Sequence, residues 1–252
     1  MNTLSFGLAV VACAGAASLA HAGGTLGTGF ADHAAFTTFV ESQGKFLKGV
    51  EDFEEAVVDD GAKLPFPNSL QSGVPRPGFD FGISATNLII QTNITPNASP
   101  VEPNPSTNQA ALWVNGAGFI GSNSIKVGTD EFLNGLYSSI DLIFTDDNKT
   151  AIGVDLGLYD GYTSGHAGWV ITTYDPAGAI IDVFNLGPTS TEPSKSFFGV
   201  WSPVPIGRLN IWGIFDMPEP FAIDNIEMWT VPTPGALTLL GASGLVAMRR
   251  RR

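Results

Sequence analysis

The chain has 252 residues, and its 24 acidic side chains outnumber its 12 lysines and arginines, so the formal net charge is −12. A surface of this sign excludes a nucleic-acid reader, because phosphate contacts need a basic patch. The single cysteine excludes an intramolecular disulfide framework and a multi-cysteine metal site. An acidic composition suits divalent cations that take oxygen ligands, such as calcium.

Residues 1–22 have the pattern of a secretory signal peptide. An apolar stretch covers about residues 4–19, and residues 20–22 read Ala-His-Ala, a small-x-small cleavage site. The alternative is a lipoprotein signal that ends at Cys13, whose thiol would then carry the lipid. Cleavage after Ala22 would instead remove Cys13 and leave the mature chain without a cysteine.

One short helix is predicted near the start of the remaining chain. Between Asp32 and Val50, the apolar residues Phe36, Phe39 and Val40 recur at helix-like spacing. Asp32 has the short polar side chain that caps helix N-termini, so the helix is expected to begin there.

The rest of segment 23–230 consists of short runs in which apolar and polar residues alternate. This period of two is typical of half-buried strands. The predicted strands are 87–91, 110–114, 138–145, 151–158, 168–174, 179–184, 196–202, 208–213 and 222–229. Residues 57–78 and 92–107 are rich in proline, asparagine and glycine, which predicts long loops. Strands at this spacing indicate one all-β domain, an antiparallel β-sandwich.

The alternation also predicts which side of a strand is buried. In segment 151–158 the apolar residues share one face, and they are Ile152, Val154, Leu156 and Leu158. Gly153, Asp155 and Gly157 form the opposite face. Ile140, Leu142 and Phe144 repeat the apolar pattern. Trp201 and Trp229 are interpreted as large buried side chains rather than as ligand platforms.

Two places have side chains that suit saccharide binding. The polar loop after segment 151–158 offers aromatic rings and polar groups in Tyr159, Asp160, Tyr162 and His166, and Trp169 follows closely. The alternative is a long hairpin whose tyrosines cover the sandwich edge. A second candidate face carries Arg208, Asn210 and Trp212, opposite Leu209 and Ile211.

Asp224 is the acidic residue whose position is most unusual. If the last strand alternates regularly, Asp224 shares a face with Ala222, Ile226 and Met228, so its carboxylate points toward the core. A buried carboxylate needs a proton, a cation or hydrogen-bond donors. The residues therefore leave two alternatives open, a calcium ion or bonding to local backbone N–H groups.

Catalytic residues are not evident. Neither His33 nor His166 stands in a serine, metal or carboxylate motif. A glycosidase needs only two opposed carboxylates, but with 24 acidic residues present such a pair proves nothing. We therefore expect no enzymatic activity.

Residues 231–252 have the organisation of a sorting signal. They begin Val-Pro-Thr-Pro-Gly, continue as an apolar run from Ala236 to Met248 and end in four arginines, Arg249, Arg250, Arg251 and Arg252. As a helix the run spans roughly 20 Å, short of the roughly 30 Å hydrocarbon core. The terminal arginines hold that end on the cytoplasmic side.

This tail resembles the PEP-CTERM sorting signal, in a Pro-Thr-Pro-Gly variant with Thr233 where glutamate is usual. Pro232, Pro234, Gly235 and the four arginines match the signal. The resemblance implies that a membrane protease of the exosortase type reads the tail and removes it, so that membrane contact through the tail is transient.

The domain itself is similar to exported jelly-roll domains found upstream of such tails. The matching motifs are Val50–Glu55, Ala151–Gly157, Ser196–Val200 and Ala222–Glu227. This resemblance implies a jelly-roll-like sandwich without enzymatic activity. It also implies a structural calcium between the first and last strands, where Glu54 or Glu55 would meet Asp224.

Together these features predict three parts: a signal peptide (1–22), a β-sandwich (23–230) and a sorting tail (231–252). The protein is expected to be exported to the cell envelope, cell surface or extracellular matrix in a structural or adhesive role. Carbohydrate binding, with an extracellular polysaccharide as partner, is the alternative, and glycoside hydrolysis is a further one.

Overall fold

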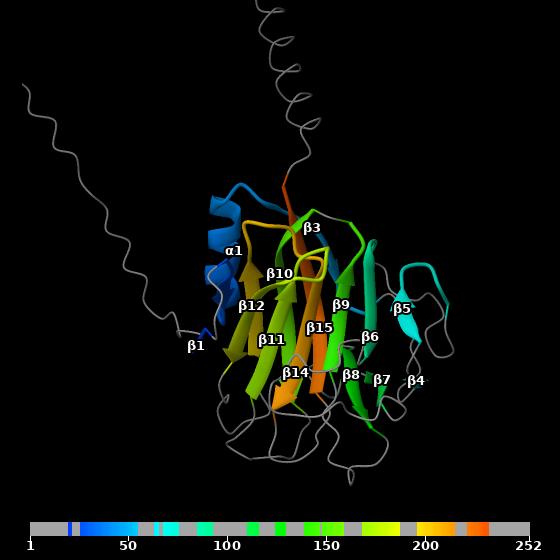
Figure 1. Ribbon diagram of the computed structural model, residues 1–252. Coiled ribbons are helices and arrows are strands. Elements are labelled where there is room, and N and C mark those ends of the chain that lie inside the picture. The colour runs from blue at the N-terminus through cyan, green and yellow to red at the C-terminus, as the bar shows by residue number, and fades with distance from the viewer. Residues whose placement is uncertain are drawn as a thin grey trace, which may run out of the picture.

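Two antiparallel sheets packed face to face, with one helix outside them, make up the described part of the chain (Figure 1). The computed structural model describes residues 20–21, 26–54, 63–65, 68–75, 85–92, 110–115, 124–129, 139–146, 148–158, 168–186, 196–214 and 221–231. The predicted all-β sandwich is confirmed. Within these ranges, no helix combines the length and apolar character needed to cross a membrane.

Sheet A faces the viewer in Figure 1. Its strands, in spatial order, are β1 (Ala20–His21), β12 (Ile180–Leu186), β11 (Gly168–Tyr174), β14 (Arg208–Ile214), β9 (Ser139–Phe144), β6 (Leu88–Thr92) and β5 (Ser69–Gln71). β1 belongs to the predicted signal peptide, so cleavage after Ala22 would remove it and leave β12 as the edge strand.

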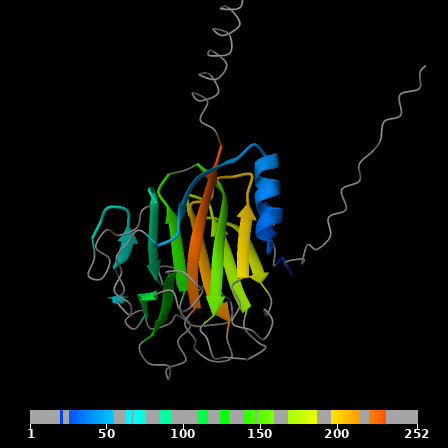
Figure 2. The ribbon, with the colours of Figure 1, turned by 180° about the vertical axis from the view of Figure 1, so that it is seen from behind.

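Sheet B lies behind sheet A and comes to the front in Figure 2. Its strands, in spatial order, are β2 (Thr28–Phe30), β13 (Ser196–Trp201), β10 (Lys149–Leu158), β15 (Phe221–Thr230), β8 (Ser124–Thr129), β7 (Ala110–Asn115) and β4 (Lys63–Pro65). β15 pairs with β8 through residues 221–223 and with β3 (Phe46–Glu51) through residues 226–230. One edge of β15 therefore has two successive partners.

The main core fills the space between the two sheets. Ile152, Val154 and Leu156 of β10 are fully buried there, and Ile140 and Leu142 of β9 meet them from sheet A. The faces predicted for these strands are confirmed. Burial of such aliphatic side chains is the main force that holds two sheets together.

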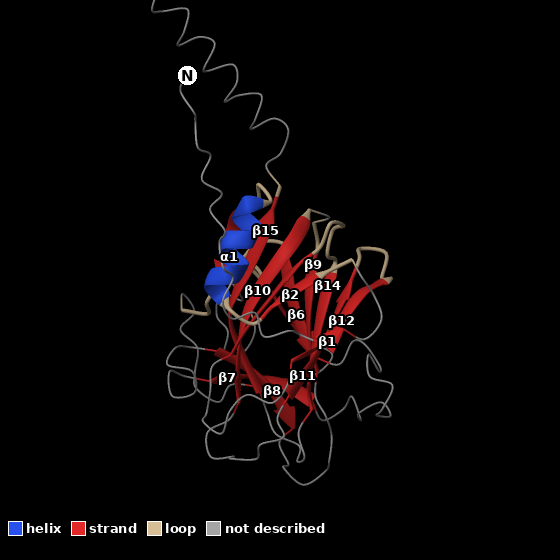
Figure 3. Ribbon diagram, turned by 90° about the vertical axis from the view of Figure 1, so that its left-hand side faces the viewer, coloured by secondary structure: helices blue, strands red, loops and turns tan. Residues whose placement is uncertain are grey.

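Helix α1 (His33–Ser42) covers part of the outer face of sheet B, as the side view of Figure 3 shows. Asp32 caps it as predicted, because its Oδ1 accepts a hydrogen bond from the Ala35 N–H at 2.7 Å. Phe36 and Val40, four residues apart, are its fully buried side chains. Gly44 at φ +70° then turns the chain toward β3.

Two glycines of sheet B make room for the helix. A Cβ atom on Gly199 would lie 2.5 Å from Cδ2 of Phe36, and one on Gly153 would lie 3.1 Å from Cε1 of the same ring. Trp229 and the partly buried Trp201 pack around this ring cluster. Trp229 is buried as predicted and Trp201 only partly, and both lie beneath α1 rather than between the sheets.

The described strands include all those predicted, with ends that differ by at most two residues. The prediction of a loop over 57–78 is wrong in part, because β4 and β5 form there. Both have only three residues, too few to show a period-two pattern.

Candidate functional site

The loop predicted to bind saccharides falls mostly outside the described residues, and these include Tyr159, Asp160, Tyr162 and His166. Trp169 is described, and its side chain is fully buried between the sheets. Its ring therefore belongs to the core and offers no surface to a sugar. The sorting residues Pro232, Pro234, Gly235 and Arg249–Arg252 also lie outside the described ranges.

Asp224 does not face the core as predicted. Between the paired residues Asp155↔Asp224 and Gly153↔Glu227, β15 has two residues where β10 has one, so β15 contains a bulge. Asn225 sits in this bulge at φ +47°. The extra residue reverses the alternation, which leaves Ile226 and Met228 in the core and puts Asp224 opposite Asp155 on the outer face. Asp224 is nevertheless fully buried, as predicted.

Hydrogen bonds within the bulge hold the Asp224 carboxylate. Its Oδ1 accepts from the backbone N–H of Asn225 at 2.7 Å, as the local-bonding alternative predicts. The Asn225 side-chain amide donates to Asp155 Oδ2 at 2.7 Å and to Asp224 Oδ2 at 3.2 Å. An amide placed between two carboxylates relieves part of their repulsion.

The acidic residues at the end of β3 and just after it do not take the positions predicted for a calcium site. Glu54 is exposed, and Glu55 lies outside the described ranges. Glu51 is the buried carboxylate, and it accepts from the N–H groups of Phe53 at 3.1 Å and Ala85 at 2.7 Å. Among the described residues, no group of three or more His, Cys, Asp or Glu side chains is placed to hold a metal ion.

The second predicted face is formed on the outer side of sheet A. Leu209 and Ile211 point into the core, while Arg208, Asn210 and Trp212 lie on the opposite side of β14. Arg208 and Trp212 are partly exposed, whereas Asn210 is buried. The one described helix lies on sheet B, so no described helix covers this face.

Arg208 and Asn210 are held by residues of the neighbouring strands. Asn210 Nδ2 donates to Oδ1 of Asp141 on β9 at 3.0 Å, and the Arg208 guanidinium lies 3.9 Å from the same oxygen. The guanidinium also lies 3.9 Å from the centre of the Tyr174 ring on β11, a cation–π contact. Burial raises the pKa of the Tyr174 hydroxyl, although the Arg208 charge opposes this.

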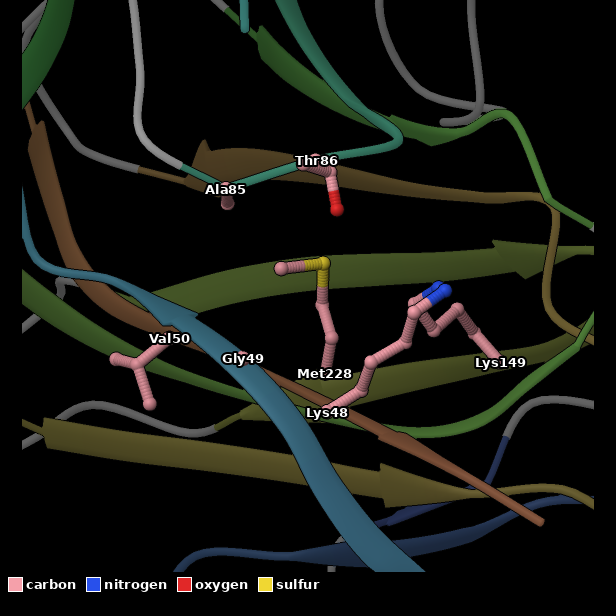
Figure 4. Close-up of a pocket in the computed structure, with 7 residues that line it drawn as sticks. All are labelled: Lys48, Gly49, Val50, Ala85, Thr86, Lys149 and Met228. Carbon is pink, nitrogen blue, oxygen red and sulfur yellow. The ribbon is translucent and has the colours of Figure 1, made fainter. Parts of the chain in front are cut away.

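A pocket that the sequence did not reveal lies at the edge of the sandwich, beside β3. Its walls are Lys48, Gly49 and Val50 of β3, Ala85 and Thr86 before β6, Lys149 of β10 and Met228 of β15 (Figure 4). The cavity measures about 190 Å³. This is below the roughly 300 Å³ of pockets for drug-sized ligands, so the cavity suits a small group. We call it the lysine pocket.

One carboxylate joins the two amines of the lysine pocket. Asp146, in the turn between β9 and β10, accepts hydrogen bonds from Nζ of both Lys48 and Lys149. Lys149 also donates to Asn148 Oδ1 at 3.2 Å, and Asn87 Nδ2 donates to Asp146 Oδ2 at 3.4 Å. The Lys149 side chain is fully buried, while that of Lys48 is 31% exposed. Access to the cluster is therefore from the Lys48 side.

The pKa values of the two lysines are shifted in opposite directions. Burial lowers the pKa of Lys149, and the nearby Lys48 amine lowers it too, against the attraction of Asp146. The hydrogen bond to Asp146 raises the pKa of Lys48. Burial disfavours ionisation of Asp146, but the hydrogen bonds and charges of the two lysines outweigh it, so the pKa of Asp146 is lowered.

No protein-family model matches the sequence, and no curated protein matches it significantly. Among solved structures, the CBM22-1 and GH10 modules of Clostridium thermocellum endo-1,4-β-D-xylanase 10B, complexed with xylohexaose, are similar to 74% of this chain. The identity is 8%, the TM-score is 0.39, and the match spans only 29% of that xylanase chain.

Family 29 carbohydrate-binding modules are also similar. One matches 57% of this chain and 90% of its own length, at 12% identity and a TM-score of 0.32. A mutant complexed with cellulohexaose matches 58% of this chain and 94% of its own length, at 13% identity and a TM-score of 0.33. Similarities this low identify neither a family nor a ligand for this chain.

Proposed function

We propose that this protein binds saccharides without catalysis and that it acts in adhesion at the cell surface or in the extracellular matrix. The observation that carries the proposal is the outer face of sheet A, where Arg208 and Trp212 are partly exposed on either side of the buried Asn210–Asp141 pair. A guanidinium held in place and a partly exposed indole on one sheet face suit the binding of a saccharide.

The chemistry of these groups matches that of a sugar. Sugar rings present hydroxyl groups at their edges and apolar C–H groups on their faces. The Arg208 fork has five N–H donors, and its contacts with Asp141 and Tyr174 hold it in place before a ligand arrives. The partly exposed indole of Trp212 supplies an apolar surface.

The spacing along β14 favours a chain of sugars over a single ring. Arg208 and Trp212 are four residues apart on one strand, which corresponds to about 14 Å at about 3.4 Å per residue. A ligand that contacts both side chains must extend over that length. Linked sugars of a polysaccharide meet this requirement, which connects saccharide binding with the adhesive role predicted from the sequence.

A glycan array tests the proposal. The purified protein should retain a defined set of oligosaccharides, and calorimetry with one of them should give a dissociation constant that Trp212→Ala weakens about tenfold or more. Arg208→Lys should also weaken binding, because an ammonium group lacks the planar fork.

Phe46→Ala is the matched control, because Phe46 is an aromatic side chain that is 45% exposed on β3 of sheet B. The affinity of Phe46→Ala for the oligosaccharide should equal that of the wild type. Retention of no glycan, or equal loss in Phe46→Ala and Trp212→Ala, would contradict the proposal. Release of shortened sugars from a bound glycan would instead favour the hydrolase alternative.

Export and sorting are part of the same proposal. The signal-peptide pattern in residues 1–22 and the resemblance of residues 231–252 to a PEP-CTERM tail support delivery outside the cell and processing by a membrane protease of the exosortase type. Val231 is exposed at the end of β15. A protease that cuts after this strand would leave the sandwich intact.

A further inference from the structure

The lysine pocket contains more hydrogen-bond donors than acceptors. Each lysine ammonium has three N–H groups. Lys149 uses two of them, on Asp146 and Asn148, and Lys48 uses one, on Asp146. Within the described part of the chain, two N–H donors of Lys48 and one of the buried Lys149 thus have no acceptor. The hydroxyl of Thr86, across the pocket in Figure 4, adds a further polar group.

The charge of this cluster is opposite in sign to that of the protein. Counted over the residues that the structure describes, two ammonium groups and one carboxylate meet here and leave a local charge of +1, while the whole chain carries −12. Lys149 is fully buried, so its charge acts where water screens it poorly. A buried surplus of positive charge is unfavourable unless an anion balances it.

Irregularities in two strands bring the amines together. Lys48 is an extra residue of β3, because Gly49 and Leu47 pair with the consecutive residues Met228 and Trp229. Thr150 is an extra residue of β10, between the paired residues Lys149 and Ala151. Each lysine therefore lies at a bulge against the same end of β15, and bulges redirect side chains beside functional sites.

The opposite wall of the pocket is also fixed in place. The Ala85 N–H donates to Glu51 Oε2 at 2.7 Å, and this bond joins the segment before β6 to the end of β3. Asn87, at φ +63°, reaches Asp146 from the same segment. Met228, a core side chain, supplies an apolar wall, so the donors stand beside a cavity instead of open solvent.

From this geometry we propose that the lysine pocket binds a small oxyanion, with Lys48 as the donor that reaches it and the buried Lys149 as a second positive charge behind it. A carboxylate, as on an acidic sugar, and free sulfate share the required chemistry. The cavity of about 190 Å³ holds one such group, and Lys48, at the accessible side, contacts it first. The site is separate from the saccharide-binding face on sheet A, so either one can exist without the other.

Calorimetry of the processed protein with D-glucuronate, sulfate and neutral D-glucose, at constant ionic strength, tests the proposal. Wild type should bind at least one of the two anions saturably and should not bind glucose in this pocket. Binding of glucuronate alone would identify a sugar acid as the ligand class, and binding of sulfate alone would identify a free anion.

Two variants locate the site. Lys48→Met should weaken anion binding about tenfold to a hundredfold, the range for loss of a charged hydrogen bond. Gly49→Val should weaken it without a change of charge. Among the described residues, Met228 Cε is the one atom within 4 Å of a Cβ there, at 3.9 Å, so the larger side chain would extend into the pocket.

Lys45→Met is the matched control, because it removes the same charge from a residue that does not line the pocket. It should leave the affinity within about twofold, since solvent and salt screen distant charges. Circular dichroism verifies that each variant is folded. The proposal is overturned if neither anion binds at tens of millimolar, or if Lys48→Met and Lys45→Met have the same effect.

Discussion

Replacement of Gly199 by alanine tests how helix α1 is seated on sheet B. The added Cβ would lie 2.5 Å from Cδ2 and 2.6 Å from Cγ of Phe36, and 2.9 Å from Cε1 of Phe197. Carbon atoms in contact are normally about 3.5 to 4.0 Å apart. The Phe36 ring, fully buried under the helix, would have to move by about 1 Å.

The expected cost follows from this overlap. Overpacking of a buried site destabilises by about 1–3 kcal/mol, and in a chain of this size each kcal/mol lowers the melting temperature by about 2–4 °C. Phe36→Ala alone should destabilise by about 3–5 kcal/mol. In the double variant the alanine no longer meets the Phe36 ring, so the two changes should couple by about 0.5–3 kcal/mol.

Urea unfolding followed by circular dichroism measures the four free energies of this cycle. Gly49→Ala is the control, because within the described ranges its new Cβ has a single neighbour closer than 4 Å, Met228 Cε at 3.9 Å. It should be neutral or slightly stabilising, as is usual when a glycine of compatible conformation becomes alanine. If Gly199→Ala destabilises equally with and without Phe36, the helix does not pack on this glycine.

Four further predictions concern other parts of the chain. Asn225→Ala should be more destabilising than Asn225→Gly in urea unfolding, because the residue has φ +47°; the opposite order would mean that the bulge is absent. The pKa of Asp146 is lowered in the folded protein. The ionised carboxylate therefore stabilises the fold above the unfolded pKa of about 3.9, and this stabilisation is lost as the pH falls through the folded pKa. Acid unfolding should show this loss in wild type but not in Asp146→Asn. If calcium binds at Asp224, the melting temperature of wild type should be higher in calcium than in chelator, and Asp224→Ala should remove the difference. Equal melting temperatures in wild type would mean that Asp224 is held by hydrogen bonds to neighbouring residues and binds no calcium. Replacement of Arg249 to Arg252 by serine should impair processing or surface display, and an unchanged mass and location by mass spectrometry would refute the role of these arginines.

The sequence by itself determined the fold class and most of the strands. Alternation in β10 places Val154 and Leu156 in the core because successive side chains of a strand point to opposite sides, a rule that needs no knowledge of the partner strand. The cap of α1 is equally local, since Asp32 bonds to a residue only three positions away. The acidic charge excludes a nucleic-acid reader on composition alone, because the net charge does not depend on how the chain folds.

Tertiary structure decided the sites. The face of Asp224 depends on a bulge, which exists only as a mismatch in register between β15 and β10. The burial of the Trp169 side chain depends on the sheet that packs across from it. Lys48 and Lys149 are about a hundred residues apart in the chain, and they meet at Asp146 because β3 and β10 both pair with β15. Such pairings form between distant segments, so the side chains that they bring together cannot be predicted from the local pattern of either segment.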